Sequence, residues 1–229
     1  MSDHTTQPAA RHPEQGTDRT NRLVAGSVFA AVATVYALTV APTFSFWDCG
    51  EFVACCYTLG IAHPPGSPLY LIIGRLFSVL PFLSDPGFGV NILSVLSSAG
   101  AALFGYLIVQ RLIAGWGGAG RLASYTGGVV GALMLACGRT AWTNGVEAEV
   151  YGLTMLMLTA VFYLAVLVFD AVTVRRRMQY LVLAAYLMTL GAGVHMTVFL
   201  AAPVLLALFA LRNSASAKVW YAFALFIAV

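Results

Sequence analysis

Two carboxylates lie three residues apart in the segment Phe46–Phe52, at Asp48 and Glu51. On a helix this spacing puts both side chains on one face. Such a pair can act as a general base, form an ion site or bind a divalent cation such as Mg²⁺ or Mn²⁺. A structural interpretation is equally open, because Asp48 as an N-cap with Glu51 at N3 is an Asp variant of the capping box. The two interpretations can coexist, since a cap also fixes the carboxylates in place.

A second motif, His63-Pro64-Pro65-Gly66-Ser67-Pro68, combines a histidine with three prolines. The prolines restrict the backbone and Gly66 permits a tight turn, so the motif predicts a rigid corner. His63 could donate or accept a proton beside Asp48, although a lone histidine is more often structural.

A third group of candidates begins at Arg139, whose planar guanidinium suits phosphate oxygens. Trp142 and Tyr151 could contact a substrate or belong to the aromatic belt of a membrane interface, and we favour the belt for Trp142. Glu149 begins an apolar run and needs a partner or water there.

The composition excludes several classes of protein. The 229 residues are 60% hydrophobic and 9% charged, with a net charge of +3 and a mean hydropathy of +0.84. An average soluble domain is about one quarter charged. A soluble globular enzyme, a disordered chain and a nucleic-acid-binding domain are therefore excluded. The four cysteines form no C-x-x-C pair and are too few for a disulfide scaffold.

Long apolar runs predict an all-α, polytopic transmembrane helical bundle. Residues 1–22 are polar and predict a disordered cytoplasmic tail, and 23–229 form the transmembrane domain. The predicted spans are Leu23–Ala41, Asn91–Gln110, Leu122–Gly138, Val150–Phe169, and two short helices within Met178–Leu211 that meet near His195. The chain stops inside the apolar run Val219–Val229, which favours the N-terminal portion of a longer protein.

The segment 68–80 decides the predicted topology. Ser67 can cap it and Pro81 ends it, which leaves a helix of about 20 Å, too short to cross a bilayer core of about 30 Å. With the N-terminus cytoplasmic, ten of the twelve Lys and Arg residues then lie inside, all but Arg75 and Arg139. If 68–80 crossed, only four would lie inside. The first arrangement makes 43–89 one extracytoplasmic loop that holds juxtamembrane helices.

The same arrangement gathers five of the nine acidic residues on the extracytoplasmic side. They are Asp48, Glu51, Asp85, Glu147 and Glu149. Because acids follow no strong orientation rule, this gathering favours a functional role.

The motifs resemble a known family. Phe46-Trp47-Asp48-Cys49-Gly50-Glu51-Phe52 and the segment Tyr57–Tyr70 are similar to the signature of a multi-spanning family whose eukaryotic relatives are protein O-mannosyltransferases of the GT-C type. Its bacterial members were long described as a domain of unknown function, and the chain is identified as one of them. The resemblance covers about residues 22–211 and continues through Arg75, Asn91, Trp142, the segment 148–151 and His195.

The resemblance implies a GT-C-like fold and an inverting glycosyltransferase. Such an enzyme takes a mannose-like sugar from a polyprenyl-phosphate donor and transfers it, on the extracytoplasmic face, to an acceptor hydroxyl of a protein or glycan. Asp48 matches the family's loop acid, Glu51 its partner and Glu149 the acid of the second outer loop. Cys49 stands where the family usually has Ser. A bacterial inner membrane is the implied location, and membrane lipids are implied partners.

We therefore expect Asp48 to take the acceptor proton and Glu51 to orient Asp48 or help hold Mg²⁺ or Mn²⁺. Positive or polar groups would bind the donor phosphate, namely Arg139 with Arg75 or His195. Other candidates would bind the acceptor or support the site, namely His63, Glu149, Tyr151, Asn91 and Trp142.

Two other classes of function stay open. The first is an ion-coupled transporter or lipid flippase that uses the outer-face carboxylates. Transporter acids usually lie near mid-membrane on broken helices, whereas these lie at one face, which favours the enzyme. The second is a non-catalytic membrane scaffold, for which loss of the Asp48 charge would be silent.

Overall fold

The computed structural model describes residues 19–81, 83, 85–116 and 118–212. Regular structure in this part of the chain is helical, which confirms the all-α prediction. The elements are α1 (Arg19–Leu38), α2 (Cys49–Thr58), α3 (Pro68–Ser78), α4 (Pro86–Ala114), α5 (Arg121–Ala136), α6 (Arg139–Gly145), α7 (Val150–Asp170), α8 (Val174–Gly191), the 3-10 helix η1 (Met196–Leu200) and α9 (Ala201–Arg212). Residues 1–18 of the predicted tail and the run Val219–Val229 lie outside the described residues.

Three described helices are long and apolar enough to cross a membrane, namely α1, α4 and α7. The predicted span Leu122–Gly138 corresponds to α5, whose 16 residues rise only about 24 Å. The two short helices predicted within Met178–Leu211 are α8 and α9, and the chain breaks between them from Gly191 to His195. Segment 68–80 forms the 11-residue α3, about 16 Å long.

Two helices begin earlier than predicted, and a specific hydrogen bond lies at the start of each. Helix α1 begins at Arg19, where the hydroxyl of Tyr106 donates to Oδ1 of the buried Asn21 at 2.6 Å. Helix α4 begins at Pro86, inside the predicted loop 43–89, because Asp85 accepts the Phe88 N–H at 2.9 Å and caps it. Tertiary and capping bonds therefore extend both helices beyond their apolar runs.

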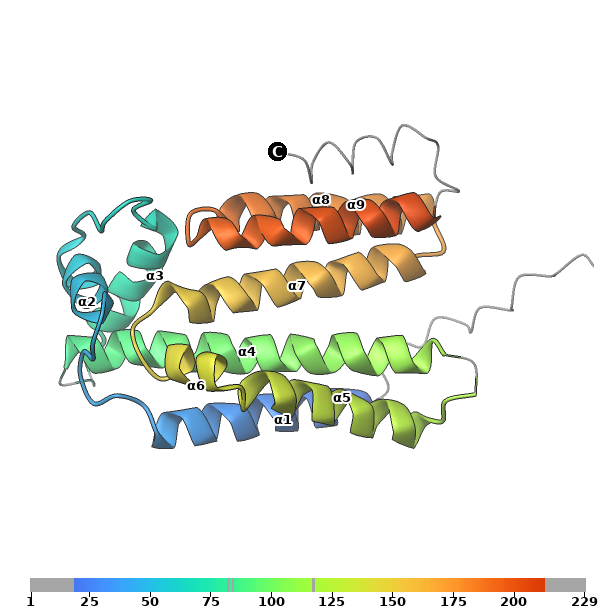
Figure 1. Ribbon diagram of the computed structural model, residues 1–229, viewed down its shortest axis with the longest axis horizontal. Coiled ribbons are helices and arrows are strands. Elements are labelled where there is room, and N and C mark those ends of the chain that lie inside the picture. The colour runs from blue at the N-terminus through green and yellow to red at the C-terminus, as the bar shows by residue number, and fades with distance from the viewer. Residues whose placement is uncertain (1–18, 82, 84, 117, 213–229) are drawn as a thin grey trace, which may run out of the picture.

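The long helices lie side by side, with α4 in contact with α1, α3, α5 and α7, and α7 in contact with α8 and α9 (Figure 1). Successive long helices alternate in direction. As a result α2, α3, α6 and the break before η1 lie together at one end of the bundle, here called the carboxylate end. Residues 115, 116 and 118–120, which follow α4, and the segment 171–173 lie at the opposite end, where Arg111 and Asp170 form an ion pair at 2.6 Å.

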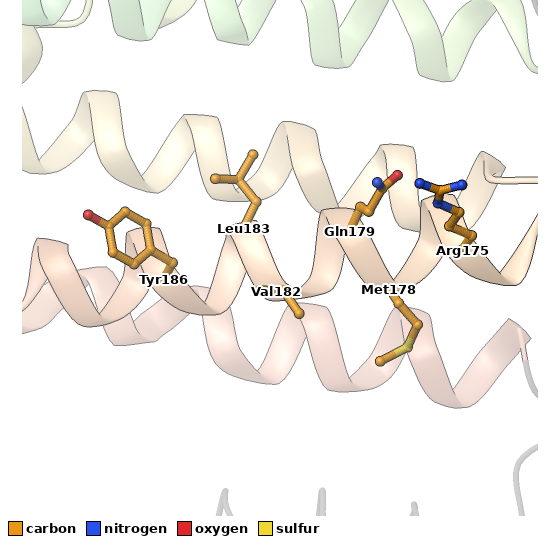
Figure 2. A pocket seen from close by; sticks show the side chains of 6 residues that line it. All are labelled: Arg175, Met178, Gln179, Val182, Leu183 and Tyr186. Atoms are coloured by element: carbon orange, nitrogen blue, oxygen red, sulfur yellow. The ribbon is translucent and has the colours of Figure 1, made fainter.

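A shallow hollow of about 580 Å³ follows one face of α8 (Figure 2). Its lining residues are Arg175, Met178, Gln179, Val182, Leu183 and Tyr186. All six belong to α8, at alternating spacings of three residues and one, so they follow one face of the helix, and none is a predicted site residue. The hollow is therefore the exposed, mainly apolar face of a helix and not an enclosed substrate site.

Candidate active site

Helices α2 and α3 form a small packed unit that carries the first two motifs. The ring of Phe52 meets the fully buried ring of Tyr70 edge-on, with centroids 5.4 Å apart. A Cβ on Gly74 would overlap the sulfur of Cys56, so glycine lets the two helices approach closely. Cys56 is fully buried, as expected for a small apolar packing residue. This unit fixes α2, and with it both carboxylates of the first motif.

The start of α3 is held by another loop. Ser67 occupies the N-cap position, as predicted, but its side chain makes no capping bond and its φ is +41°. Instead, the N–H of Leu69 donates to the carbonyl of Gly193 at 2.8 Å. Since the first N–H groups of a helix lack intrahelical partners, this carbonyl takes the role predicted for the serine hydroxyl. The contact ties the α8–η1 break to the residue that directly follows the second motif.

Asp48 is placed as predicted but does not act as a side-chain cap. It precedes α2 at the N-cap position, where its backbone is already helical, with φ −81° and ψ −2°. Its carboxylate makes no capping bond, and its side chain is 58% exposed. The capping-box interpretation is therefore wrong for the side chain. The carboxylate is left accessible at the carboxylate end.

Glu51 is bound at two points by His63. Its Oε1 accepts the backbone N–H of His63 at 2.6 Å, and its Oε2 lies 2.8 Å from Nδ1 of the ring. The bond to His63 lowers the pKa of Glu51, and the bond to Glu51 raises the pKa of His63. The other ring nitrogen, Nε2, lies 4.0 Å from Oδ2 of Asp48. His63 and Asp48 therefore lie close to each other, as predicted.

Glu149 reaches the same region from the start of α7. It is 7% exposed, and burial raises the pKa of its carboxyl group. The sulfur of Cys49 lies 3.6 Å from Oε1 of Glu149, and burial raises the pKa of this thiol to about 11. The neutral thiol therefore serves as a weak donor to the carboxylate.

One residue that contacts the acids at this end, Ser45, escaped the sequence analysis. The hydroxyl of Ser45 donates to Oε2 of Glu147 and also lies 3.4 Å from the sulfur of Cys49. These bonds join the segment before α2 to the segment before α7. The gathering of acids predicted for this side of the protein included Glu147, but no sequence signal indicated Ser45.

Within the described part of the chain, neither of the two predicted phosphate-binding arginines forms an ion pair with a carboxylate. Arg75 donates to the carbonyl of Tyr57, at the far end of α2 from Asp48, and its guanidinium stacks over the Tyr57 ring at 5.3 Å. Arg139 is exposed at the start of α6 and, among the described residues, forms no salt bridge. Arg139 is therefore accessible at the carboxylate end, whereas Arg75 already has a partner.

Two other candidates, Asn91 and Trp142, make contacts that support the helical bundle. The side-chain N–H groups of Asn91 donate to the carbonyls of Ala41 and Thr43 at 2.8 and 2.7 Å, which holds the chain leaving α1. Trp142 packs on Tyr36, with ring centroids 5.3 Å apart. Both residues thus have structural contacts within the bundle.

His195 and Tyr151 form a separate pair at the carboxylate end. Their ring centroids are 5.3 Å apart, and Tyr151 is 46% exposed. His195 also lies before η1, with Nδ1 2.9 Å from the hydroxyl of Thr197. A half-exposed aromatic pair of this kind can contact a substrate.

Comparison with known proteins decides the family. The family model of the protein O-mannosyl-transferase TMEM260 N-terminal domain matches residues 48–218. The chain belongs to this family. The TMEM260 match begins at Asp48 and includes every predicted site residue through His195. The resemblance inferred from the motifs is therefore confirmed at the level of the family.

Two curated TMEM260 proteins are similar to this chain. The mouse protein O-mannosyl-transferase TMEM260 is 30% identical over 160 residues, which cover 70% of this chain and 22% of the mouse protein. Protein O-mannosyl-transferase tmem260 of Dictyostelium discoideum is 26% identical over 150 residues, which cover 62% of this chain and 17% of that protein. The chain thus spans about a fifth of the length of these relatives. No solved structure matches the chain.

Proposed function

We propose that this chain carries the proton-accepting part of a membrane glycosyltransferase of the GT-C type. The single observation that carries the proposal is the Asp48 carboxylate, exposed and without a capping bond at the end of the bundle where the segments before α2, α3 and α7 meet. The relatives, named protein O-mannosyl-transferases, favour a mannose-like sugar and a protein acceptor.

The proposed reaction is a single displacement at the anomeric carbon. Asp48 takes the proton of an acceptor hydroxyl while that oxygen attacks the carbon from the face opposite the phosphate. The new bond from oxygen to carbon forms as the bond from carbon to the phosphate oxygen breaks. The leaving polyprenyl phosphate keeps the electron pair of that bond, and the configuration at carbon is inverted.

Arg139 is the proposed donor-phosphate ligand. Its guanidinium is exposed at the carboxylate end, and a planar fork of N–H groups can bind two phosphate oxygens at once. The exposed ring of Tyr151 and the adjacent His195 offer a second contact surface at the same end. Arg75 would have to leave Tyr57 to take this role.

The donor set at Asp48 also fits a divalent cation. One ligand atom each from Asp48, Glu51 and His63 lies within 4.8 Å of the others. Carboxylate oxygens suit Mg²⁺ and Mn²⁺, and a bound cation would reduce the negative charge on a phosphate nearby.

The proposed orientation places the carboxylate end outside the cytoplasm and the N-terminus inside, in the inner membrane of a bacterium. The Arg and Lys distribution supports this orientation. The positions of the acids favour the enzyme over the transporter, because Asp48, Glu51 and Glu149 precede or begin helices at one end of the bundle. Transporter sites usually lie at the middle of broken spans.

Sugar transfer by the purified natural-length protein tests the proposal. The protein is placed in lipid vesicles with polyprenyl-phosphate mannose labelled in the sugar and with Ser- and Thr-containing acceptor peptides. We expect label to move to the peptide hydroxyls, and the new linkage to have the opposite anomeric configuration to the donor. Ion flux across the vesicles without any labelled peptide would overturn the proposal in favour of a transporter.

A further inference from the structure

We propose that His195 donates a hydrogen bond from Nε2 to a phosphate oxygen of the lipid-linked sugar donor. The inference rests on the proposed transferase function and deepens it, since it assigns one defined atom to the phosphate. It gives His195, rather than Arg75, the second role at the donor phosphate after Arg139. Arg75 already donates to the carbonyl of Tyr57.

The hydrogen bonds of His195 decide which ring nitrogen carries the proton. The backbone N–H of Thr197 can only donate, and it donates to Nδ1 at 3.3 Å. Nδ1 is therefore an acceptor without a proton, and the Thr197 hydroxyl, 2.9 Å from the same atom, donates to it as well. In a neutral imidazole the proton then resides on Nε2. His195 thus presents an N–H donor at Nε2 and not a base.

Two contacts place this ring at the carboxylate end. The ring of Tyr151, two positions after Glu149, lies against it with centroids 5.3 Å apart. Two residues before His195, the carbonyl of Gly193 accepts the Leu69 N–H at 2.8 Å. His195 is therefore held near the start of α7 and the start of α3, the two elements that border the candidate active site.

The Nε2–H group is accessible to a ligand. Within the described part of the chain, the hydrogen bonds of the His195 side chain are those of Nδ1. The side chain is half-buried, and Nε2 is not among the buried polar atoms that lack a partner. Nε2 can therefore be reached from outside the protein, while the other ring nitrogen holds the ring in place.

The surroundings of His195 favour a lipid phosphate as the ligand. A shallow, mainly apolar hollow of about 340 Å³ begins directly after this residue, and its lining residues are Met196, Thr197, Phe199, Leu200 and Pro203. An N–H donor beside an apolar surface suits a ligand in which an anionic oxygen is joined to a hydrocarbon chain. Polyprenyl phosphates and ordinary phospholipids share this chemistry. The position next to the start of α7 favours the sugar donor.

The proposed hydrogen bond strengthens during the reaction. As the bond from the anomeric carbon to the phosphate oxygen breaks, the electron pair stays with the phosphate and its negative charge grows. Hydrogen bonds to more highly charged oxygens are stronger, so Nε2–H stabilises the leaving phosphate more than the bound donor. The proton stays on Nε2 throughout, because the polyprenyl phosphate leaves as an anion.

Two substitutions separate the phosphate contact from the cap of η1. In His195→Asn, Oδ1 takes about the place of Nδ1 and can still accept the Thr197 N–H, but no donor reaches the position of Nε2. In His195→Gln, the amide N–H reaches about as far as Nε2, whereas the acceptor for Thr197 is lost. The two variants therefore each keep one of the two roles of His195.

Donor titrations with the natural-length protein in vesicles measure the phosphate contact. We expect kcat/KM for polyprenyl-phosphate mannose to fall about 10- to 100-fold in His195→Asn and less in His195→Gln, with the KM for the acceptor peptide unchanged in both. The melting temperature should fall more in His195→Gln. A residue that only caps η1 would give the reverse order of activities. Activities that follow the melting temperatures, or a wild-type kcat/KM in His195→Asn, would overturn the inference.

Nuclear magnetic resonance provides a second test that needs no transfer activity. Histidine rings are uncharged at about pH 9, where nitrogen signals distinguish a proton on Nε2 from one on Nδ1. The His195→Asn variant identifies the signals of His195. In a maltoside detergent, which has no phosphate, we expect the proton on Nε2 and a shift of this signal with polyprenyl-phosphate mannose but not with phosphatidylglycerol.

Two results of this measurement would overturn the inference, namely a proton on Nδ1 or an equal shift with phosphatidylglycerol. The second result would assign His195 to ordinary phospholipid headgroups. A wild type whose Nε2 signal responds to the sugar donor, but which transfers no sugar, would support the phosphate contact and contradict the proposed function.

Discussion

The sulfur of Cys49 lies 3.6 Å from Oε1 of Glu149, and this contact joins the first turn of α2 to the start of α7 across 100 residues. Both side chains are buried, so the link lies beneath the exposed Asp48 rather than beside it. Glu149 therefore lies under the site, next to the neutral thiol of Cys49, and supports the site from below.

The first prediction concerns the stability of the protein with Glu149→Gln. Burial raises the pKa of Glu149 above its ordinary value of 4.5, so the folded protein holds a proton that the unfolded chain releases. The free energy of unfolding contributed by this group therefore falls as pH rises from the unfolded to the folded pKa, and it stays lower above that window. Glutamine has no such dependence. Melting temperatures of both proteins across this pH range should diverge in favour of the variant as pH rises, and parallel curves would contradict the burial of a charged group.

The second prediction concerns the packing of α3 on α4. A Cβ on Gly89 would overlap the backbone carbonyl of Phe77, so Gly89→Ala should push the helices apart and cost about 1–3 kcal/mol. Gly26, on α1, has no atom within 4 Å of such a Cβ. Gly26→Ala is therefore a matched control that should be neutral or stabilise by up to about 1 kcal/mol. Thermal unfolding in detergent compares the two, and equal melting temperatures would argue against the close approach of α3 and α4.

The third prediction concerns the orientation of the bundle. Ile61 is 91% exposed at the carboxylate end, and Trp116 is 76% exposed at the opposite end. In a protein whose native cysteines are replaced, membrane-impermeant thiol reagents should label Ile61→Cys in intact cells. They should label Trp116→Cys only after the membrane is opened. The reverse pattern would place the carboxylate end in the cytoplasm.

The fourth prediction concerns Arg139. A cation that only snorkels to the interface needs charge and length, so Arg139→Lys would be harmless in that case. A phosphate ligand uses the planar fork, which Lys lacks. We expect Arg139→Lys to weaken use of the donor lipid about 10- to 100-fold, equivalent to a loss of about 1.5–3 kcal/mol, with an unchanged melting temperature. Titration of the donor against the transfer rate measures this effect, and coincident curves would remove Arg139 from the site.

Local sequence patterns predicted the helices and much of the candidate active site around Asp48 and Glu51. Apolar runs located the long helices, and Gly191 to His195 marked the break before η1. Pro68 marked the start of α3, which ends at Ser78, a little before Pro81. The spacing of Asp48 and Glu51 predicted their common face. These signals are local, because helix periodicity and caps depend on residues a few positions apart.

The contacts between distant segments could not be predicted in the same way. The Gly193 carbonyl replaces the expected Ser67 cap, and the bond from Ser45 to Glu147 spans 102 residues. Arg75 turns to Tyr57 because both lie on one packed helix pair. Each depends on how helices dock, which no local pattern in one sequence specifies.

The measurement that tests the account most directly is sugar transfer by Asp48→Asn in the natural-length protein. The Asp48 side chain makes no capping bond, so the variant should fold and melt like the wild type. Loss of the base should lower the transfer rate by about 10²–10⁴-fold. Glu147→Gln, which removes another carboxylate at the same end, should retain most of the rate. A folded Asp48→Asn protein that transfers sugar at the wild-type rate would contradict the assignment of Asp48 as the base.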